Sequence, residues 1–327
     1  MAEYKAIRGH TIRTIAGDAS PLVTGDIWYN SGARKIRGAK IGAGAWASGA
    51  ALNTGRYTLG GAGGSNTAAL VFAGYTSPGV AVQDITEEYN GTAWSEEADL
   101  TTARNDVAGC GGTQTAALCI QGDNPGGILN VTEKWNGTSW SEVGDLNTAR
   151  FSHAACGTVT AALVTGGRTP SHVGVTETYD GSSWSETGDM STVRAYFAIA
   201  GTTTAALGAA GYNSGSPTTA NSEEFDGSSW TEGNNVNTGR WGIGGTGTQT
   251  LALIYVGQPP FTGKTEEYDG SSWTEVADVP VTQNYGNNSV GTQSSALLAG
   301  GHNPPSGVLD TSYEWDKSIG ASSITSS

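Results

Sequence analysis

The residues most suited to chemistry in this sequence are arginines and glutamates that recur together. Five arginines open successive segments, and each is followed 26 to 31 residues later by a glutamate. A guanidinium can pair with a carboxylate through parallel hydrogen bonds, or it can bind an anion from solution. We expect a structural pair in each segment, with an anion-binding arginine rim as the alternative. The pairs are Arg56 with Glu87, Arg104 with Glu133, Arg150 with Glu177, Arg194 with Glu223, and Arg240 with Glu266.

A sixth segment departs from this pattern at both positions. Gln283 stands in the arginine position, and Tyr313 stands in the glutamate position. Because the same copy lacks both charged groups, internal comparison supports direct contact between the two positions in the other five copies.

The other reactive side chains form no recognisable catalytic pattern. The four histidines, His10, His153, His172 and His302, lie in no zinc-binding motif, and the chain has no G-x-S-x-G or P-loop sequence. The three cysteines have no metal-ligand spacing, and we interpret them as reduced strand residues. We therefore expect no catalytic residue, no metal and no cofactor. A glycosidase carboxylate pair stays open, because folding sets its partners.

The arginines and glutamates belong to a repeated unit. The phrase TETYDGSSWSETGDM at residues 176–190 recurs with few changes, and its tryptophan marks each copy. Successive marker tryptophans are 48, 46, 44, 46 and 43 residues apart, a period typical of four-stranded propeller blades. The markers are Trp46, Trp94, Trp140, Trp184, Trp230 and Trp273.

Each unit is predicted to contain four short strands. In the third copy they cover 151–157, 161–167, 175–181 and 182–190. Asp-Gly or Asn-Gly between the third and fourth strands supplies the positive φ angles of a tight hairpin. Small residues in the first strand suit a crowded propeller axis, whereas the repeated aromatic residues are expected to fill the space between neighbouring blades.

The two ends of the chain are expected to complete one unit between them. Six sets of first, second and third strands follow Trp46, and the last set ends at 311–316 without a tryptophan-bearing fourth strand. The segment around Trp46 is a fourth strand with no unit before it. We therefore predict an all-β, six-bladed β-propeller over residues 39–317. The strand around Trp46 closes its last blade and removes the open sheet edges.

The repeat resembles a known family. The Gly pair that ends the second strand, the Tyr-Asp-Gly of the third and the Trp of the fourth resemble kelch-repeat β-propellers over residues 39–317. The wider pattern NTAR…GTQTAALxxGG…TEEYDGSSW is similar to kelch-like proteins of tailed bacteriophages of marine bacteria. The phrase TGDIWYNSGARKIRG at 24–38 resembles segments of phage tail and fibre proteins. The resemblance implies a virion protein. Kelch-fold copper oxidases need a Tyr–Cys cross-link and two His ligands, and no such set can be assembled here.

The loops between the second and third strands differ from copy to copy, whereas the turns on the other face are stereotyped. These loops cover 74–83, 122–130, 167–174, 211–221, 257–263 and 301–307. Variable loops on a rigid scaffold are the usual place for binding specificity. We expect this loop face to bind a receptor, and loop drift without selection is the alternative for any single residue. The candidates are Tyr75, Asn124, Arg168, His172, Tyr212, Phe261, His302 and Asn303.

Charge divides the chain into a basic head and an acidic body. The net charge is −14, although residues 1–40 carry seven basic and three acidic groups. An acidic body argues against binding to a nucleic-acid backbone. No apolar run is long enough to insert in a membrane, and no secretory signal precedes the repeats.

The two terminal segments lie outside the predicted propeller. Residues 1–38 are expected to be an extended segment for virion attachment or oligomerisation, and 318–327 a flexible tail. A homo-oligomer is left open. The attachment candidates, which would contact other virion proteins, are Trp28, Tyr29, Arg34, Lys35 and Arg37.

The sequence therefore favours a structural virion protein without enzymatic activity, made in the host cytoplasm. The leading hypothesis is a tail- or fibre-associated adhesin whose loop face binds a host-surface glycan or protein receptor, with many copies adding up through avidity. The alternatives are a capsid-decorating propeller, a kelch-type oxidase or glycan-active enzyme, and an intracellular scaffold.

Overall fold

The computed structural model describes residues 13–22, 26–77, 81–215, 217–285 and 290–323. Within these residues the chain is all-β and contains no helix that could cross a membrane. Two compact units are present: Ala45–Asp316 forms the larger, and the smaller combines Met1–Gly44 with Lys317–Ser327. The larger unit therefore begins six residues after the predicted boundary at 39.

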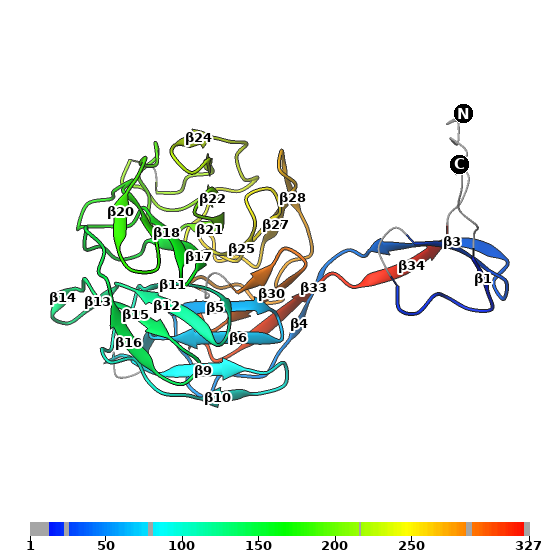
Figure 1. Ribbon diagram of the computed structural model, residues 1–327, viewed down its shortest axis with the longest axis horizontal. Coiled ribbons are helices and arrows are strands. Elements are labelled where there is room, and N and C mark those ends of the chain that lie inside the picture. Colours follow the sequence, from blue (N-terminus) through cyan, green and yellow to red (C-terminus); the bar gives the residue numbers. More distant parts are fainter. Residues whose placement is uncertain (1–12, 23–25, 78–80, 216, 286–289, 324–327) are drawn as a thin grey trace. The chain divides into compact units, whose positions relative to one another are not determined.

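In its described part, the larger unit contains six four-stranded antiparallel sheets, and Figure 1 shows them arranged around a common centre. The first strands are β5 (Gly60–Ser65), β11 (Ala108–Thr113), β17 (Ala154–Thr158), β21 (Ala198–Thr202), β25 (Gly244–Gly247) and β29 (Gly291–Thr292). The second strands are β6 (Ala68–Phe72), β12 (Ala116–Ile120), β18 (Ala161–Thr165), β22 (Ala205–Ala209), β26 (Ala252–Tyr255) and β30 (Ser295–Ala299).

The outer half of each sheet carries the repeated phrase. The third strands are β9 (Thr86–Tyr89), β15 (Thr132–Trp135), β19 (Thr176–Tyr179), β23 (Ser222–Phe225), β27 (Thr265–Tyr268) and β33 (Ser312–Asp316). The fourth strands are β10 (Trp94–Glu96), β16 (Trp140–Val143), β20 (Trp184–Glu186), β24 (Trp230–Glu232), β28 (Trp273–Glu275) and β4 (Ala45–Ser48).

The last sheet takes its fourth strand from the N-terminal side of the chain. β4 pairs antiparallel with β33, with Trp46 opposite Trp315. The Trp46 ring also packs 5.1 Å from the ring of Tyr255 in the fifth sheet. The last sheet contacts the first as well, because the Asn66 amide donates to the carbonyl of Trp315 at 3.1 Å. The segment around Trp46 therefore occupies the place that the repeat predicted for it.

Small residues let the first strands approach one another near the centre. Residues from all six first strands or their flanking turns line a channel of about 360 Å³. A Cβ added to Gly109 would lie 2.5 Å from the backbone of Gly61 in the neighbouring sheet, closer than any side chain allows. The glycines of these strands are thus required by packing, as well as by turns.

The marker tryptophans fill the space between sheets. Trp140 of the second sheet lies 4.9 Å, ring to ring, from Phe72 of the first, and its Nε1 donates to Thr86 Oγ1 at 2.9 Å. Burying such large rings contributes strongly to stability, and the hydrogen bond satisfies the indole nitrogen. The aromatic repeat is therefore core, as expected from the sequence.

Three loops between second and third strands contain a short hairpin of their own. These hairpins are β7 (Tyr75–Thr76) with β8 (Ala81–Val82), β13 (Asp123–Asn124) with β14 (Gly127–Ile128), and β31 (His302–Asn303) with β32 (Gly307–Val308).

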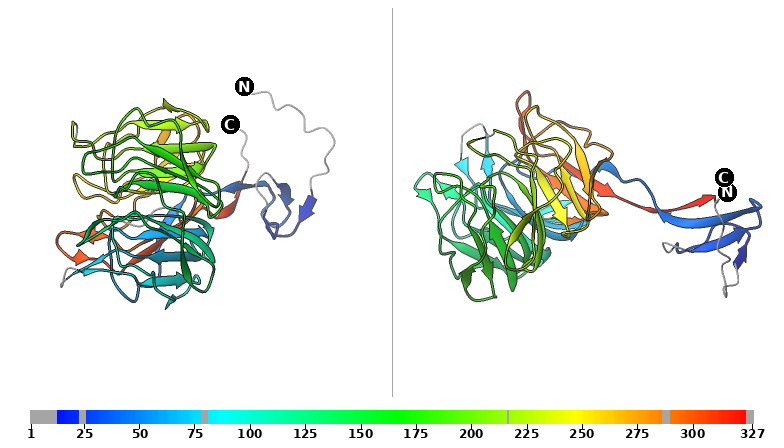
Figure 2. Two further views of the ribbon diagram at one scale, coloured as in Figure 1. Left: turned by 60° about the vertical axis from the view of Figure 1, so that its left-hand side comes forward. Right: turned by 90° about the horizontal axis from the view of Figure 1, so that it is seen from above.

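The smaller unit is one four-stranded sheet built from both ends of the chain, with the order β1 (Arg13–Ile15), β2 (Ile27–Asn30), β3 (Lys35–Ile41) and β34 (Ile319–Ser323) (Figure 2). The pairing of β1 with β2 is parallel, whereas β34 runs antiparallel to β3. The predicted free tail is thus wrong for Ile319–Ser323, because these residues supply the backbone partners of β3. Of the expected head at 1–38 and tail at 318–327, residues 1–12, 23–25 and 324–327 lie outside the described residues.

Candidate functional site

The five Arg–Glu pairs form within their sheets and are completely shielded from solvent. The separations between guanidinium and carboxylate atoms are 3.1 Å for Arg56–Glu87, 2.7 Å for Arg104–Glu133 and 2.9 Å for Arg150–Glu177. Arg194–Glu223 and Arg240–Glu266 form the same contact. Because all ten side chains are at most 1% exposed, they cannot form an anion-binding rim on the surface.

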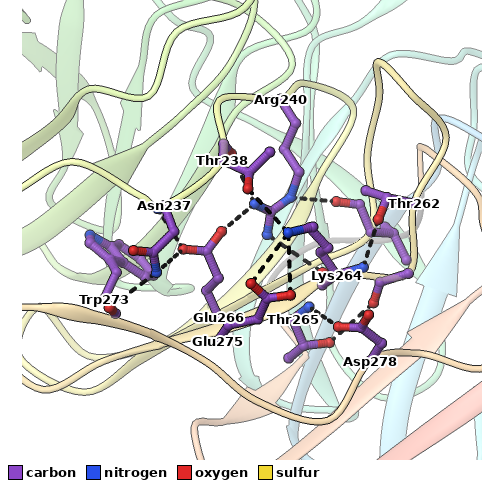
Figure 3. A network of polar contacts seen from close by, with 12 residues as sticks. Asn237, Thr238, Arg240, Thr262, Lys264, Thr265, Glu266, Trp273, Glu275 and Asp278 are labelled. Carbon is purple, nitrogen blue, oxygen red and sulfur yellow. Dashed lines mark hydrogen bonds and ion pairs between the residues drawn. The ribbon is translucent and has the colours of Figure 1, made fainter.

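Each of these glutamates also accepts a hydrogen bond from the backbone of the connecting segment that leads into its own sheet. The Glu266 carboxylate accepts a hydrogen bond from the backbone N–H of Asn237 at 2.7 Å as well as from Arg240 (Figure 3). Equivalent backbone donors reach the other four carboxylates at 2.7 or 2.8 Å; they are Asn53, Thr101, Asn147 and Ser191. The pair is therefore a structural device that fixes how one sheet follows the next.

Two positions beyond each of the five arginines, and beyond Gln283 in the sixth sheet, the backbone turns into the left-handed region. The φ angles there lie between 50° and 66°. Backbone hydrogen bonds run from one of these residues to the next: from Tyr285 to Gly242, Gly242 to Tyr196, Tyr196 to Ser152 and Ser152 to Asp106. We call these six residues the axial ring: Thr58, Asp106, Ser152, Tyr196, Gly242 and Tyr285.

The axial ring lines a cavity of about 40 Å³, together with His153 and four apolar residues, Leu59, Val107, Phe197 and Ile243. The sequence-based predictions did not include this ring. A signal was present, because the residue two places after the arginine differs in most copies of an otherwise repetitive unit. A position whose residue type differs between copies, while its neighbours are repeated, is typical of a binding surface.

Aromatic side chains form a connected cluster above this cavity. Tyr285 lies 5.4 Å from Tyr196, 5.6 Å from Trp241 and 5.9 Å from Tyr57, measured between ring centroids. Tyr212 extends the cluster at 5.6 Å from Trp241. These rings come from four different sheets, so the fold assembles a surface that no single repeat contains.

One side of the cluster forms a pocket of about 510 Å³, which we call the aromatic pocket. It includes three residues predicted from the sequence: Arg168, His172 and Tyr212. The Arg168 guanidinium lies 5.6 Å from the Phe151 ring centroid, and its Nε donates to the carbonyl of Pro170 at 3.3 Å. Burial and the charge of Arg168 lower the pKa of His172. The remaining lining residues are Pro170, Ser171, Tyr196, Ser214, Trp241 and Tyr285.

A second pocket of about 560 Å³ lies where the first and second sheets present their loops. It includes the predicted residues Tyr75 and Asn124, with Tyr57 and Asp123 beside them. The structure thus divides the predicted binding residues between two pockets. Phe261, His302 and Asn303 line neither; His302 packs 5.4 Å from Tyr57, and the Asn303 amide donates to the carbonyl of Thr282 at 2.8 Å.

Burial keeps most titratable side chains around the axial cavity uncharged. One carboxyl group, Asp106, has a pKa close to neutral pH. Burial, assisted by the charge of Asp123, raises the pKa of Asp106 to about 7. Burial and the nearby Arg150 lower the pKa of His153 to about 3, so its ring is neutral. Burial raises the pKa of Tyr196 to about 12 and also raises that of Tyr285. Asp106 is therefore the group whose charge can respond to a ligand near neutral pH.

The attachment residues predicted in the smaller unit fall into two groups. Trp28 is 2% exposed, so it serves as core of this unit and is not available for contact with a partner. Arg37 is paired with Asp18 at 3.0 Å. Arg34 and Lys35 are exposed, and Tyr29 is half-buried. Hydrogen bonds from Asn30 and Arg37 lower the pKa of Asp18.

The described residues hold no cluster of three or more metal-ligating side chains. No protein-family model matches the chain, and no curated protein matches it. The chain is similar in structure to a solved protein described as "Structure of YjhT", with a TM-score of 0.66 and 13% sequence identity. The match covers 81% of this chain and 95% of the other. At this level of identity the likeness shows a propeller-like fold and carries no information about activity.

Proposed function

We propose that the larger unit is a closed six-bladed propeller of the kelch type and that its loop face binds a glycan. The aromatic pocket carries this proposal, because Trp241, Tyr212 and Tyr285 offer ring faces beside the polar side chains of Arg168 and His172. Sugars present apolar C–H faces edged by hydroxyls, and aromatic rings with a few convergent polar groups suit both. The pairing of β4 with β33 and the contacts of the last sheet with the first support closure.

The biological setting that we propose is a phage virion, with the protein as a tail- or fibre-associated adhesin. The support is the resemblance of residues 24–38 to tail and fibre proteins and the separate small sheet that those residues build. Several weak glycan sites on one particle would act together through avidity. A capsid-decorating protein is the second location compatible with the same fold.

The binding proposal is tested with a glycan array and a pair of variants. We expect Trp241→Ala to abolish glycan binding, because Trp241 is the half-buried tryptophan that lines the aromatic pocket. Leu251→Ala is the matched control, since Leu251 is 51% exposed in a turn that lines no pocket described above. Glycan binding that survives Trp241→Ala would contradict the proposed site. Antibody labelling of virions by electron microscopy separates tail from capsid, and unlabelled particles would overturn the virion setting.

A further inference from the structure

The axial cavity contains hydrogen-bonding atoms that the protein does not satisfy. His153 lines the cavity and is 5% exposed, and the backbone of Ile120 lies close to its ring. In the described part of the chain neither ring nitrogen forms a hydrogen bond of normal geometry. A buried polar group without a partner costs free energy unless a ligand or water satisfies it. Because His153 is neutral, one of its nitrogens is available as an acceptor. A small polar group that donates a hydrogen bond would satisfy the acceptor nitrogen.

The size of the cavity limits what can enter. A volume of about 40 Å³ holds a few water-sized groups and cannot hold a sugar ring. Tyr196 and Tyr285 line both this cavity and the aromatic pocket, so the two spaces adjoin. A sugar in the pocket would thus place a single substituent into the cavity.

The charge around the cavity favours a cation. Asp106 lines it, and the charge of Asp123 acts on Asp106. Two cations lie nearby: Arg150 is paired with Glu177, and Arg168 is held at the pocket rim by Phe151 and Pro170. Tyr196 and Tyr285 line the cavity, and Tyr57 and Trp241 pack against the Tyr285 ring; aromatic faces attract cations.

We infer that the axial cavity receives an ammonium group carried by the sugar, so that the loop face selects glycans with a free amine. An ammonium supplies three hydrogen-bond donors and a positive charge, whereas a hydroxyl supplies one donor. An acetamido group has four heavy atoms and exceeds the space. This inference rests on the proposed glycan site and adds the chemical class of its ligand.

The test compares three trisaccharides that share one backbone and differ at the second carbon: β-1,4-linked glucosamine, N-acetylglucosamine and glucose. Binding is measured by calorimetry with the full-length protein at pH 7.5. We expect the glucosamine trisaccharide to bind about tenfold more tightly than the other two. Asp106→Asn should remove that preference, since Asn keeps the shape and tolerates the left-handed backbone of this position.

Asp310→Asn is the matched control. It removes the same formal charge from an exposed carboxylate that lines none of the described pockets, so it accounts for general attraction of a cation to an acidic protein. We expect this variant to keep the tenfold preference. Loss of preference in both variants would overturn the inference by assigning the effect to net charge.

A pH series on the unmodified protein gives a readout that does not depend on the folding of a variant. Asp106 is the cavity-lining group expected to change charge below pH 7, and the charges of Asp123 and Arg168 act on it. Burial also raises the pKa of Asp123, so its protonation would lower the negative charge in the same direction. Tyr57, Tyr196 and Tyr285 stay neutral because their pKa values are raised, and His153 stays neutral because its pKa is lowered. Affinity for the glucosamine trisaccharide should fall from pH 7.5 to pH 5.5, although the amine gains positive charge. A constant or rising affinity would overturn the inference.

The remaining outcomes separate this inference from the glycan proposal. The unmodified protein could bind all three trisaccharides equally, with binding lost in Trp241→Ala. That result would support the glycan site and reject selection for an amine. Binding of none of the three would count against both. A preference for glucosamine that persists in Asp106→Asn would reject the axial cavity as its source.

Discussion

Arg150 donates through Nη1 to Glu177 Oε1 at 2.9 Å, and neither side chain is exposed to solvent. The same carboxylate accepts from the backbone N–H of Asn147 at 2.7 Å. Two charges buried together are costly, and further hydrogen bonds to either group offset part of that cost. Here a backbone N–H of the connecting segment supplies a further hydrogen bond to the carboxylate. The ion pair and the position of that segment therefore depend on each other.

Removing one member of this pair should be severely destabilising. We expect Glu177→Gln to lower the free energy of unfolding by about 3–5 kcal/mol, because it leaves a buried guanidinium without its counter-charge. Glu186→Gln is the control, since Glu186 lies opposite Glu177 on the neighbouring strand but is exposed. Denaturant unfolding measures both variants, and equal effects would show that the pair is not what stabilises the sheet.

In the sixth sheet, which lacks the Arg–Glu pair, the pair can be introduced instead of removed. Gln283→Arg alone should destabilise the protein, because the Gln283 amide now donates to the carbonyl of Gly300 at 2.7 Å and Tyr313 offers no charge. Adding Tyr313→Glu should recover part of the loss. A double-mutant cycle should yield a favourable coupling of about 1–3 kcal/mol. Additive effects would mean that these positions do not meet in the sixth sheet as they do in the other five.

Asp106 should make stability depend on pH. Its pKa rises from an ordinary value of 3.8 to about 7 in the folded protein, so between these values the native state holds a proton that the unfolded chain has lost. Stability contributed by this group is therefore lost as pH rises through that window. We expect Asp106→Asn to stabilise the protein by on the order of 2–4 kcal/mol near pH 8, with the gain vanishing near pH 4. Thermal unfolding at both pH values checks this, and a gain that is independent of pH would refute it.

The strand β4 should be required by the larger unit, whereas the residues before it should not. Deleting residues 1–43 removes part of the smaller unit and should leave unfolding of Ala45–Asp316 nearly unchanged. Deleting residues 1–49 also removes β4, and with it the contacts of Trp46 with β33 and Tyr255. We expect that second deletion to cost more than about 3 kcal/mol. Equal melting temperatures for the two deletions would show that β4 is dispensable.

The periodic part of the structure could be predicted from the sequence, because repetition exposes it. The spacing of the marker tryptophans predicted the four-stranded sheets, and the joint loss of both charges at Gln283 and Tyr313 predicted the Arg–Glu contacts. Trp46 was assigned to the last sheet because one copy lacked a fourth strand. Each of these inferences used a comparison between copies.

Structural features that occur only once in the chain could not be predicted by comparing copies of the repeat. The pairing of β34 with β3 joins segments from opposite ends of the chain, and Ile319–Ser323 has no strong strand pattern of its own. The prediction of Trp28 as an attachment residue is wrong, since burial in a small sheet depends on partners that local sequence does not reveal. The axial ring was missed because its members are close only after six sheets surround one centre.

The chain passes between its two units twice, once at Gly44–Ala45 and once at Asp316–Lys317. A single proteolytic cut at either crossing leaves the other peptide connection intact, and the pairing of β3 with β34 then holds the severed segment in the smaller unit. The link therefore has a redundancy that one connecting peptide lacks. Release of the propeller from strands β1 to β3 requires a cut at Gly44–Ala45 together with either a cut at Asp316–Lys317 or separation of β34 from β3.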